Sequence, residues 1–123
     1  MKNAINWFEI PSIDFDRAVE FYNNIINWKL MIDDTMWMKM ALFPSDKMEW
    51  IWGAIIYTPN VKPSQDWVTV YLNAWDNLDD MISKIEMAWW KIIIPKMDIW
   101  KEMWFIIQFI DSEWNRIGAH WMM

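Results

Sequence analysis

Apolar and polar residues alternate with two different periods along this chain, and together they predict helices and strands. Over residues 15–26 the apolar side chains recur every three or four positions, which is typical of an amphipathic helix. Asp14 precedes this run and is expected to be the N-cap. A second helix is expected to begin after Asp76 or Asn77. Its buried stripe is predicted to consist of Leu78, Met81, Ile82, Ile85 and Ala88.

Eight shorter runs show the two-residue period or the continuous apolar character of strands. They are residues 4–10, 28–33, 37–43, 51–58, 67–74, 91–95, 104–110 and 115–121. Pro11 is expected to end the first strand because it has no N–H to donate. Residues 59–66, with two prolines and polar neighbours, are predicted to form a linker.

The two halves of the chain share one order: a strand, a helix and three strands. The helical stripes superpose at a fixed offset of 63 residues, so that Phe15 corresponds to Leu78 and Tyr22 to Ile85. A unit with an open sheet edge and one apolar face needs a partner. We therefore predict a single α+β domain over residues 1–123, with module one at 1–58 and module two at 67–123. The two βαβββ modules are expected to form one curved, mixed eight-stranded sheet whose concave face is free for a ligand.

Composition and charge exclude several classes of function. The 123 residues include 11 Lys and Arg against 17 Asp and Glu, a formal charge of −6, and no basic cluster of the kind that nucleic-acid binding requires. There is no cysteine and one histidine, His120, which excludes disulfides and Cys- or His-rich metal sites within one chain. No apolar run is long enough for a membrane span, and the first residues do not resemble a signal peptide. The expected location is the cytoplasm.

Three segments make the chain resemble a known family. Residues 10–15 (IPSIDF) resemble the first strand-to-helix passage of the vicinal oxygen chelate superfamily. Residues 91–95 (KIIIP) and 109–117 (FIDSEWNRI) resemble its second module. This superfamily includes glyoxalase I, bleomycin resistance proteins and extradiol dioxygenases. The resemblance covers essentially the whole chain and implies the glyoxalase/bleomycin resistance fold.

The chain has 13 Trp and only 2 Gly, and the resemblance bears on this imbalance. Trp114 stands where the family has glycine in a turn, and Trp89 and Trp90 stand where a glycine pair commonly ends the second helix. Seven more tryptophans fall at turn or strand-entry positions that suit glycine: Trp37, Trp50, Trp52, Trp67, Trp75, Trp100 and Trp104. One interpretation is a bacterial gene whose UGA codons mean glycine but were translated as tryptophan. The other is a protein that truly carries these tryptophans.

The resemblance also implies where a divalent metal would bind. The family's four ligand positions correspond here to Trp7, Thr69 or Val70, Ile56 or Tyr57, and Gly118. None of these residues has a carboxylate or imidazole, which such a cation needs. We therefore expect no metal and no other cofactor.

Strand periodicity then selects the residues that face the predicted cup. Glu9 shares a face with Trp7, and Arg116 and His120 flank Gly118. The middle strand contributes Thr69, Tyr71 and Asn73. Glu9 could anchor a ligand or act as a general base, or it could simply pair with Arg116 or His120. His120 could act as an acid or base, or could lie at the edge of the core.

The favoured function is binding of a small apolar or aromatic molecule without a metal, by a homodimer, as in bleomycin-resistance-type proteins. The alternative is a glyoxalase-like lyase or isomerase, or a dioxygenase-related enzyme, with Glu9 as base and a bound divalent metal. A third possibility is a partner-binding module with an empty cup.

Overall fold

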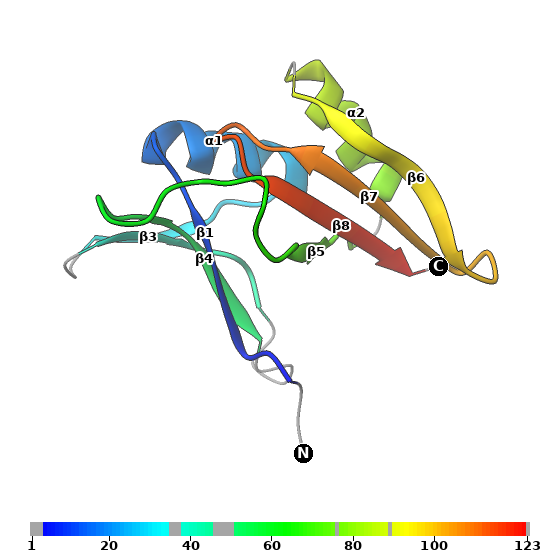
Figure 1. The fold of residues 1–123 in the computed structure, drawn as a ribbon, viewed down its shortest axis with the longest axis horizontal. Coiled ribbons are helices and arrows are strands. Elements are labelled where there is room, and N and C mark those ends of the chain that lie inside the picture. Colours follow the sequence, from blue (N-terminus) through cyan, green and yellow to red (C-terminus); the bar gives the residue numbers. More distant parts are fainter. Residues whose placement is uncertain (1–3, 35–37, 46–50, 76, 89, 123) are drawn as a thin grey trace.

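The predicted βαβββ repeat is present in the computed structural model, which describes residues 4–34, 38–45, 51–75, 77–88 and 90–122 (Figure 1). Module one consists of β1 (Trp7–Pro11), α1 (Phe15–Ile26), β2 (Met31–Asp33), β3 (Lys39–Leu42) and β4 (Trp52–Tyr57). Module two consists of β5 (Tyr71–Asn73), α2 (Leu78–Met87), β6 (Ile92–Trp100), β7 (Trp104–Ile110) and β8 (Arg116–Met122). Residues 59–66 between the modules contain neither helix nor strand.

Both helices begin where the sequence predicts. The Asp14 carboxylate accepts the Arg17 N–H at 3.0 Å at the start of α1. The side chain of Asn77 accepts the Asp80 N–H at 2.9 Å at the start of α2, while Asp76 lies outside the described residues. Each bond satisfies one of the N–H groups that a helix leaves without an internal partner. Helix α1 ends at Asn27, whose φ of 54° is left-handed, a conformation that asparagine tolerates better than most residues.

The predicted fold class is confirmed, with one difference in the sheets. Hydrogen bonds among the described residues divide the strands into two four-stranded sheets, ordered β1-β4-β3-β2 and β5-β8-β7-β6. In each sheet the first pair is parallel and the others antiparallel. No ladder joins β1 to β5, because the modules meet through α1, α2 and a shared core rather than through strand edges.

Most strands differ in length from the sequence prediction, and β1 includes Pro11 instead of ending before it. Strands β5 and β6 differ most. Strand β5 begins at Tyr71 rather than at residue 67, so Thr69 precedes it. Strand β6 continues to Trp100, beyond the predicted end at Pro95, because it pairs with β7 through several shifts of register. An edge strand tolerates the missing N–H of proline, and β6 is an edge of its sheet.

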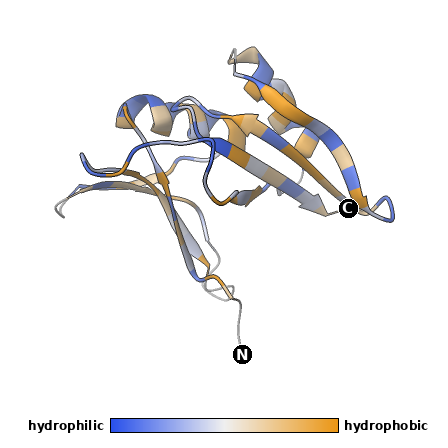
Figure 2. Cartoon of the chain, viewed as in Figure 1, coloured by the Kyte–Doolittle hydropathy of each residue, from blue (hydrophilic) through white to orange (hydrophobic). Residues whose placement is uncertain are grey.

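One hydrophobic core joins both helices and both sheets. It includes Tyr22 and Ile25 of α1, Ile85 of α2, and Ile55 and Ile107 of the two sheets, all fully or almost fully buried. Most residues along the inner strand β7 are apolar, while the tip of the β6–β7 hairpin is polar (Figure 2). None of the helices in the described part of the chain is long and apolar enough to cross a membrane.

The core divides each sheet into two faces. On β8, Ile117 and Ala119 pack into the core, so the alternating residues Arg116, Gly118 and His120 lie on the opposite face. By the same alternation, Ile10 of β1 and Leu72 of β5 belong to the core. We call the face of each sheet that is turned away from the core its cup face. The predicted site residues on β1 and β5 therefore lie on cup faces.

Candidate functional site

A tyrosine ring lying over a glycine is the central feature of the cup face of module two. Tyr71 and Gly118 are register partners in the parallel pair β5–β8. A Cβ atom at Gly118 would lie 2.3 Å from Cδ1 of Tyr71, a distance that real side chains do not adopt. The absence of a side chain at Gly118 therefore allows the ring to lie across β8.

The tyrosine reaches across β8 to a glutamine on the next strand. Gln108 of β7 is the antiparallel register partner of Gly118. Its Nε2 donates a hydrogen bond of 2.7 Å to the Tyr71 hydroxyl oxygen. Gln108 is 9% exposed and Tyr71 is 41% exposed, so the buried amide holds the partly exposed phenol. Sequence reasoning missed Gln108; its signal was a polar residue in the apolar run at 104–110.

His120 and Asn73 lie beside this pair. They are register partners, and each lies two residues further along its strand than Tyr71 or Gly118. They therefore share the face of that pair. The His120 ring meets Trp104 edge-to-face, with ring centroids 5.7 Å apart. The Asn73 side-chain oxygen accepts the Trp75 N–H at 2.7 Å. The structure thus gathers Tyr71, Asn73 and His120 on one face, as the strand periodicity predicts.

Arg116 and Thr69 lie at the edge of this group. Nη2 of Arg116 donates to the Trp67 carbonyl at 3.2 Å, while its Nε is buried and finds no acceptor among the described residues. The side chain of Thr69 is half-buried just before β5. Arg116 therefore brings a positive charge to the cup face with no carboxylate paired to it in the described part of the chain.

Trp7 and Glu9 lie on the other sheet, in β1. The Trp7 indole Nε1 donates to Glu9 Oε2 at 3.1 Å. The pairing of Glu9 with Arg116 or His120 considered from sequence is therefore wrong. Those two residues belong to the sheet of module two, and the neighbouring indole supplies the hydrogen bond instead.

The residues at the family's metal positions do not fit a divalent metal. The register sets Tyr71, rather than Thr69 or Val70, opposite Gly118. In module one, Trp7 of β1 takes the place that Tyr71 has in β5. Its indole nitrogen can only donate a hydrogen bond, and Glu9 already accepts that bond. No three His, Asp or Glu side chains of the described residues cluster as metal ligands would. The polar groups at these positions can thus form hydrogen bonds but do not form a set of metal ligands.

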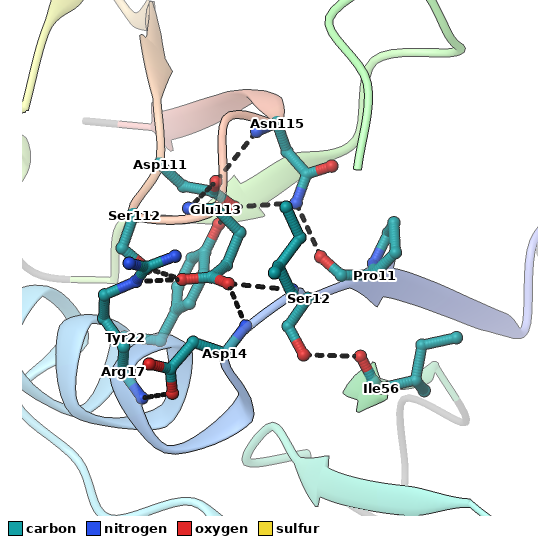
Figure 3. A network of polar contacts seen from close by, with 11 residues as sticks. Pro11, Ser12, Asp14, Arg17, Tyr22, Ile56, Asp111, Ser112, Glu113 and Asn115 are labelled. Carbon is teal, nitrogen blue, oxygen red and sulfur yellow. Dashed lines mark hydrogen bonds and ion pairs between the residues drawn. The ribbon is translucent and has the colours of Figure 1, made fainter. Parts of the chain in front are cut away.

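A second polar cluster is buried at the turn from β7 to β8 (Figure 3). Glu113 is fully buried and accepts the N–H groups of Ile13 and Asp14 at 2.8 and 2.6 Å. It also accepts Nε of Arg17 at 2.7 Å. The turn of module two thus holds the N-terminus of α1 in module one. This hydrogen bond to Glu113 raises the pKa of Arg17.

Asp111 completes this cluster, which we call the turn network. Its carboxylate accepts the Tyr22 hydroxyl at 2.6 Å and the backbone and side-chain N–H groups of Asn115 at 2.9 and 3.1 Å. Asn115 in turn donates to the Pro11 carbonyl at 2.7 Å. Burial raises the pKa of Asp111, against the opposing effect of these hydrogen bonds. Burial, followed by the charge of Asp111, raises the pKa of Tyr22 well above its usual value.

The resemblance includes Asp111 and Glu113 but predicts no role for their carboxylates. Asp111 and Glu113 are saturated with partners and closed to solvent, so the turn network joins the modules rather than meeting a ligand. The signal that could have identified it was the Asp-x-Glu-x-Asn spacing directly after an apolar strand.

Two hollows lie beside the helices. One of about 930 Å³ is enclosed by the C-terminus of α1, the β3–β4 region and the N-terminus of α2; Trp28, Trp52 and Trp75 are among its walls. A groove of about 570 Å³ runs along α1. None of the predicted site residues lines either hollow.

No family profile and no curated protein matches the sequence. Solved structures match it closely in fold. A virulence protein from Salmonella typhimurium matches with a TM-score of 0.68 at 12% identity, over 100% of this chain and 99% of that one. The FosX fosfomycin resistance protein from Listeria monocytogenes, in complex with Mn(II) and 1S,2S-dihydroxypropylphosphonic acid, gives 0.68 at 13% identity over 100% and 95%.

A glyoxylase/bleomycin resistance protein/dioxygenase domain from Frankia gives a TM-score of 0.67 at 13% identity, over 100% of this chain and 94% of that domain. All these identities are low, and what the similarity demonstrates is the fold. The chain has the fold of the vicinal oxygen chelate superfamily, as its sequence resemblance implies.

Proposed function

We propose that this protein binds a small apolar or aromatic molecule on its cup faces without using a metal. The observation that carries the proposal is the exposure of aromatic side chains on these faces. Trp7 and Tyr71 are 40% and 41% exposed, and a few polar groups lie beside them. Apolar walls with a few well-placed polar groups are typical of small-molecule sites.

The proposal includes a homodimer. In one chain the cup faces belong to separate sheets, and each sheet has an unpaired edge strand, β1 or β5. Apolar side chains exposed on such faces favour burial against a partner. A second copy offers the same faces, so that β1 of one copy and β5 of the other would enclose a ligand between them.

Proteins of similar fold include enzymes that hold a metal, such as FosX in its complex with Mn(II) and a dihydroxypropylphosphonic acid. The metal positions of this chain have no carboxylate or imidazole, so sequestration of a ligand is favoured over metal-dependent turnover. The enzymatic alternative depends on Glu9 as a base, since this half-buried carboxylate lies on the cup face of β1.

Metal analysis and a thermal-shift screen with small aromatic molecules test the proposal. We expect metal-free protein to be stabilised by at least one aromatic compound, since a ligand at 100 times its Kd stabilises the native state by about 2.7 kcal/mol. Stoichiometric zinc, nickel or iron in the purified protein would contradict the proposal. So would turnover of the methylglyoxal–glutathione adduct that the Glu9→Gln variant abolishes. Sedimentation at several concentrations tests the dimer.

A further inference from the structure

We propose that Tyr71, held by Gln108, is the hydrogen-bond donor of the cup and stands in place of the family's metal-binding carboxylate. The ligand is then an aromatic molecule with an anionic acceptor, such as a carboxylate. This inference rests on the proposed function and specifies its ligand class.

The first step is steric. The family's last metal ligand is a glutamate at the position of Gly118. In this chain the Tyr71 ring fills the space over that residue, with ring atoms 2.3 and 2.4 Å from where a Cβ would be. A glutamate at 118 and a tyrosine lying over β8 therefore exclude each other. The exchange replaces a carboxylate with a phenol.

The second step concerns the direction of the hydrogen bond. Gln108 Nε2 donates to the Tyr71 oxygen at 2.7 Å, so the phenolic hydrogen is not used in that bond. Gln108 is 9% exposed and fixes the position of the oxygen from the strand beneath. A hydroxyl that is oriented in advance donates to a ligand with little loss of conformational entropy.

The third step concerns charge. Arg116 shares the cup face with Gly118, two residues away on β8. Its hydrogen bond is to a backbone carbonyl, and no ion pair compensates its charge among the described residues. A positive charge on the same face as a free hydroxyl donor favours an anionic acceptor over a neutral one.

The test compares benzoate with toluene, which have the same ring but differ in the acceptor. In the unmodified protein, followed by NMR titration of the backbone amides, we expect benzoate to bind more tightly and to shift signals of β5 and β8. Tyr71→Phe should weaken benzoate roughly ten-fold, since a hydrogen bond to a charged group is lost, and should leave toluene unchanged. Tyr57→Phe is the matched control. Tyr57 is also partly exposed (38%), but it shares the face of Ile55, which packs into the core, and so does not lie on a cup face.

The outcomes separate this inference from the proposed function. Benzoate affinity that Tyr71→Phe leaves unchanged would overturn the inference while the proposed function stands. Failure of both probes to bind would count against the proposed function, and the inference would fall with it. Stoichiometric Zn²⁺ binding that is lost in His120→Ala would also overturn the inference, because it would restore a metal to this face.

A separate observation concerns the tryptophans. We infer that the chain made by its source organism carries glycine at Trp75 and Trp114, and, on a separate observation, at Trp67. Trp75 and Trp114 have φ values of 52° and 72°, in the left-handed region that disfavours side chains with a Cβ. Both are among the ten positions that the sequence marks as suited to glycine. Trp37, Trp50 and Trp89 lie outside the described residues.

One further tryptophan fits its surroundings poorly. The indole Nε1 of Trp67 is buried and finds no partner among the described residues, an arrangement that native structures rarely contain.

Mass spectrometry of peptides from the native organism tests this inference directly. Glycine at 75 and 114 would support it, and tryptophan or UGG codons there would overturn it. In recombinant protein, Trp75→Gly and Trp114→Gly should each raise Tm by a few degrees, because the strain of a left-handed φ is relieved. Trp28→Gly is the control: Trp28 is also exposed but has no left-handed φ, and its replacement should not raise Tm. A fall in Tm for both test variants would contradict the inference.

Discussion

The turn network and the Tyr71–Gln108 pair are both polar clusters in module two, but they differ in charge and in spare hydrogen-bonding capacity. Glu113 and Asp111 are charged, fully buried and saturated with partners drawn from both modules. Tyr71 and Gln108 are neutral, and the tyrosine is exposed at one side of the ring. One cluster holds the chain together, and the other keeps a donor free.

The comparison shows that a charged side chain in an apolar segment is a weak guide to function. A buried charge is stable only when it is fully paired, and full pairing leaves nothing for a ligand. A ligand site requires the opposite condition, which is a polar atom held in place with one hydrogen-bond donor or acceptor position unused. In this chain neutral groups meet that condition better than Glu113 or Asp111 do.

Removing the charge at the centre of the turn network should have the largest effect. Glu113→Ala leaves the first N–H groups of α1 and the Arg17 guanidinium without their acceptor. We expect a loss of about 3–5 kcal/mol in the free energy of unfolding, because each of these donors left without an acceptor costs about 1–3 kcal/mol. Urea unfolding monitors this loss. Glu9→Ala, which removes a half-buried carboxylate with one hydrogen bond to Trp7, should cost less than about 1.5 kcal/mol.

A Glu113→Ala variant as stable as Glu9→Ala would contradict the assignment of the turn network to stability. Arg17→Ala sharpens the comparison. The Arg17 side chain is 46% exposed, and its removal leaves Glu113 with both backbone donors and Ser112. Its cost should therefore lie between those of the two glutamate variants.

Asp111 provides a test through pH. Because burial raises its pKa in the folded state, the native protein binds this proton more tightly than the unfolded chain does. Its contribution to stability is thus fully present below the ordinary carboxyl pKa of about 4 and is lost as pH rises through the raised value. Asp111→Asn cannot titrate. The stability of the unmodified protein relative to this variant should therefore fall as pH rises above about 4.

Urea unfolding at several pH values measures this difference. Asp16→Asn, in the exposed first turn of α1, is the matched control and should show no such trend. A relative stability that rises with pH would mean that the hydrogen bonds from Tyr22 and Asn115 outweigh burial at Asp111.

The local parts of the fold follow from the sequence. Asp14 and Asn77 are caps because their side chains reach a backbone N–H three residues on, a geometry that needs no distant contact. The repeat can be recognised from the sequence because the buried apolar residues of the two helices follow the same spacing. The division into two sheets is not visible, since β1 and β5 have the same alternation whether or not they pair.

The candidate site could be predicted only in part. Period two places Tyr71, Asn73 and His120 on one face, and the register confirms their proximity. Gln108 was missed because its partner is 37 residues away and depends on Gly118 lying between them. Glu9 drew attention because a carboxylate in an apolar strand needs a partner, yet its partner is the indole two residues before it.

Replacing each of the two glycines with alanine should have the smallest effect on stability, and the two losses should differ. Gly53→Ala would bring a Cβ to 2.1 Å from the Phe8 ring, which packs against Phe43 of the core. Gly118→Ala would bring one to 2.3 Å from Tyr71, whose exposed ring can turn away from β8. We expect losses in the free energy of unfolding of about 1–3 kcal/mol for Gly53→Ala and about 1 kcal/mol for Gly118→Ala. The second loss comes mainly from Gln108, which is left without its partner.

Ligand binding should show the reverse order, because only Gly118→Ala displaces the donor. Equal loss of benzoate binding in both variants would mean that Tyr71 is not that donor.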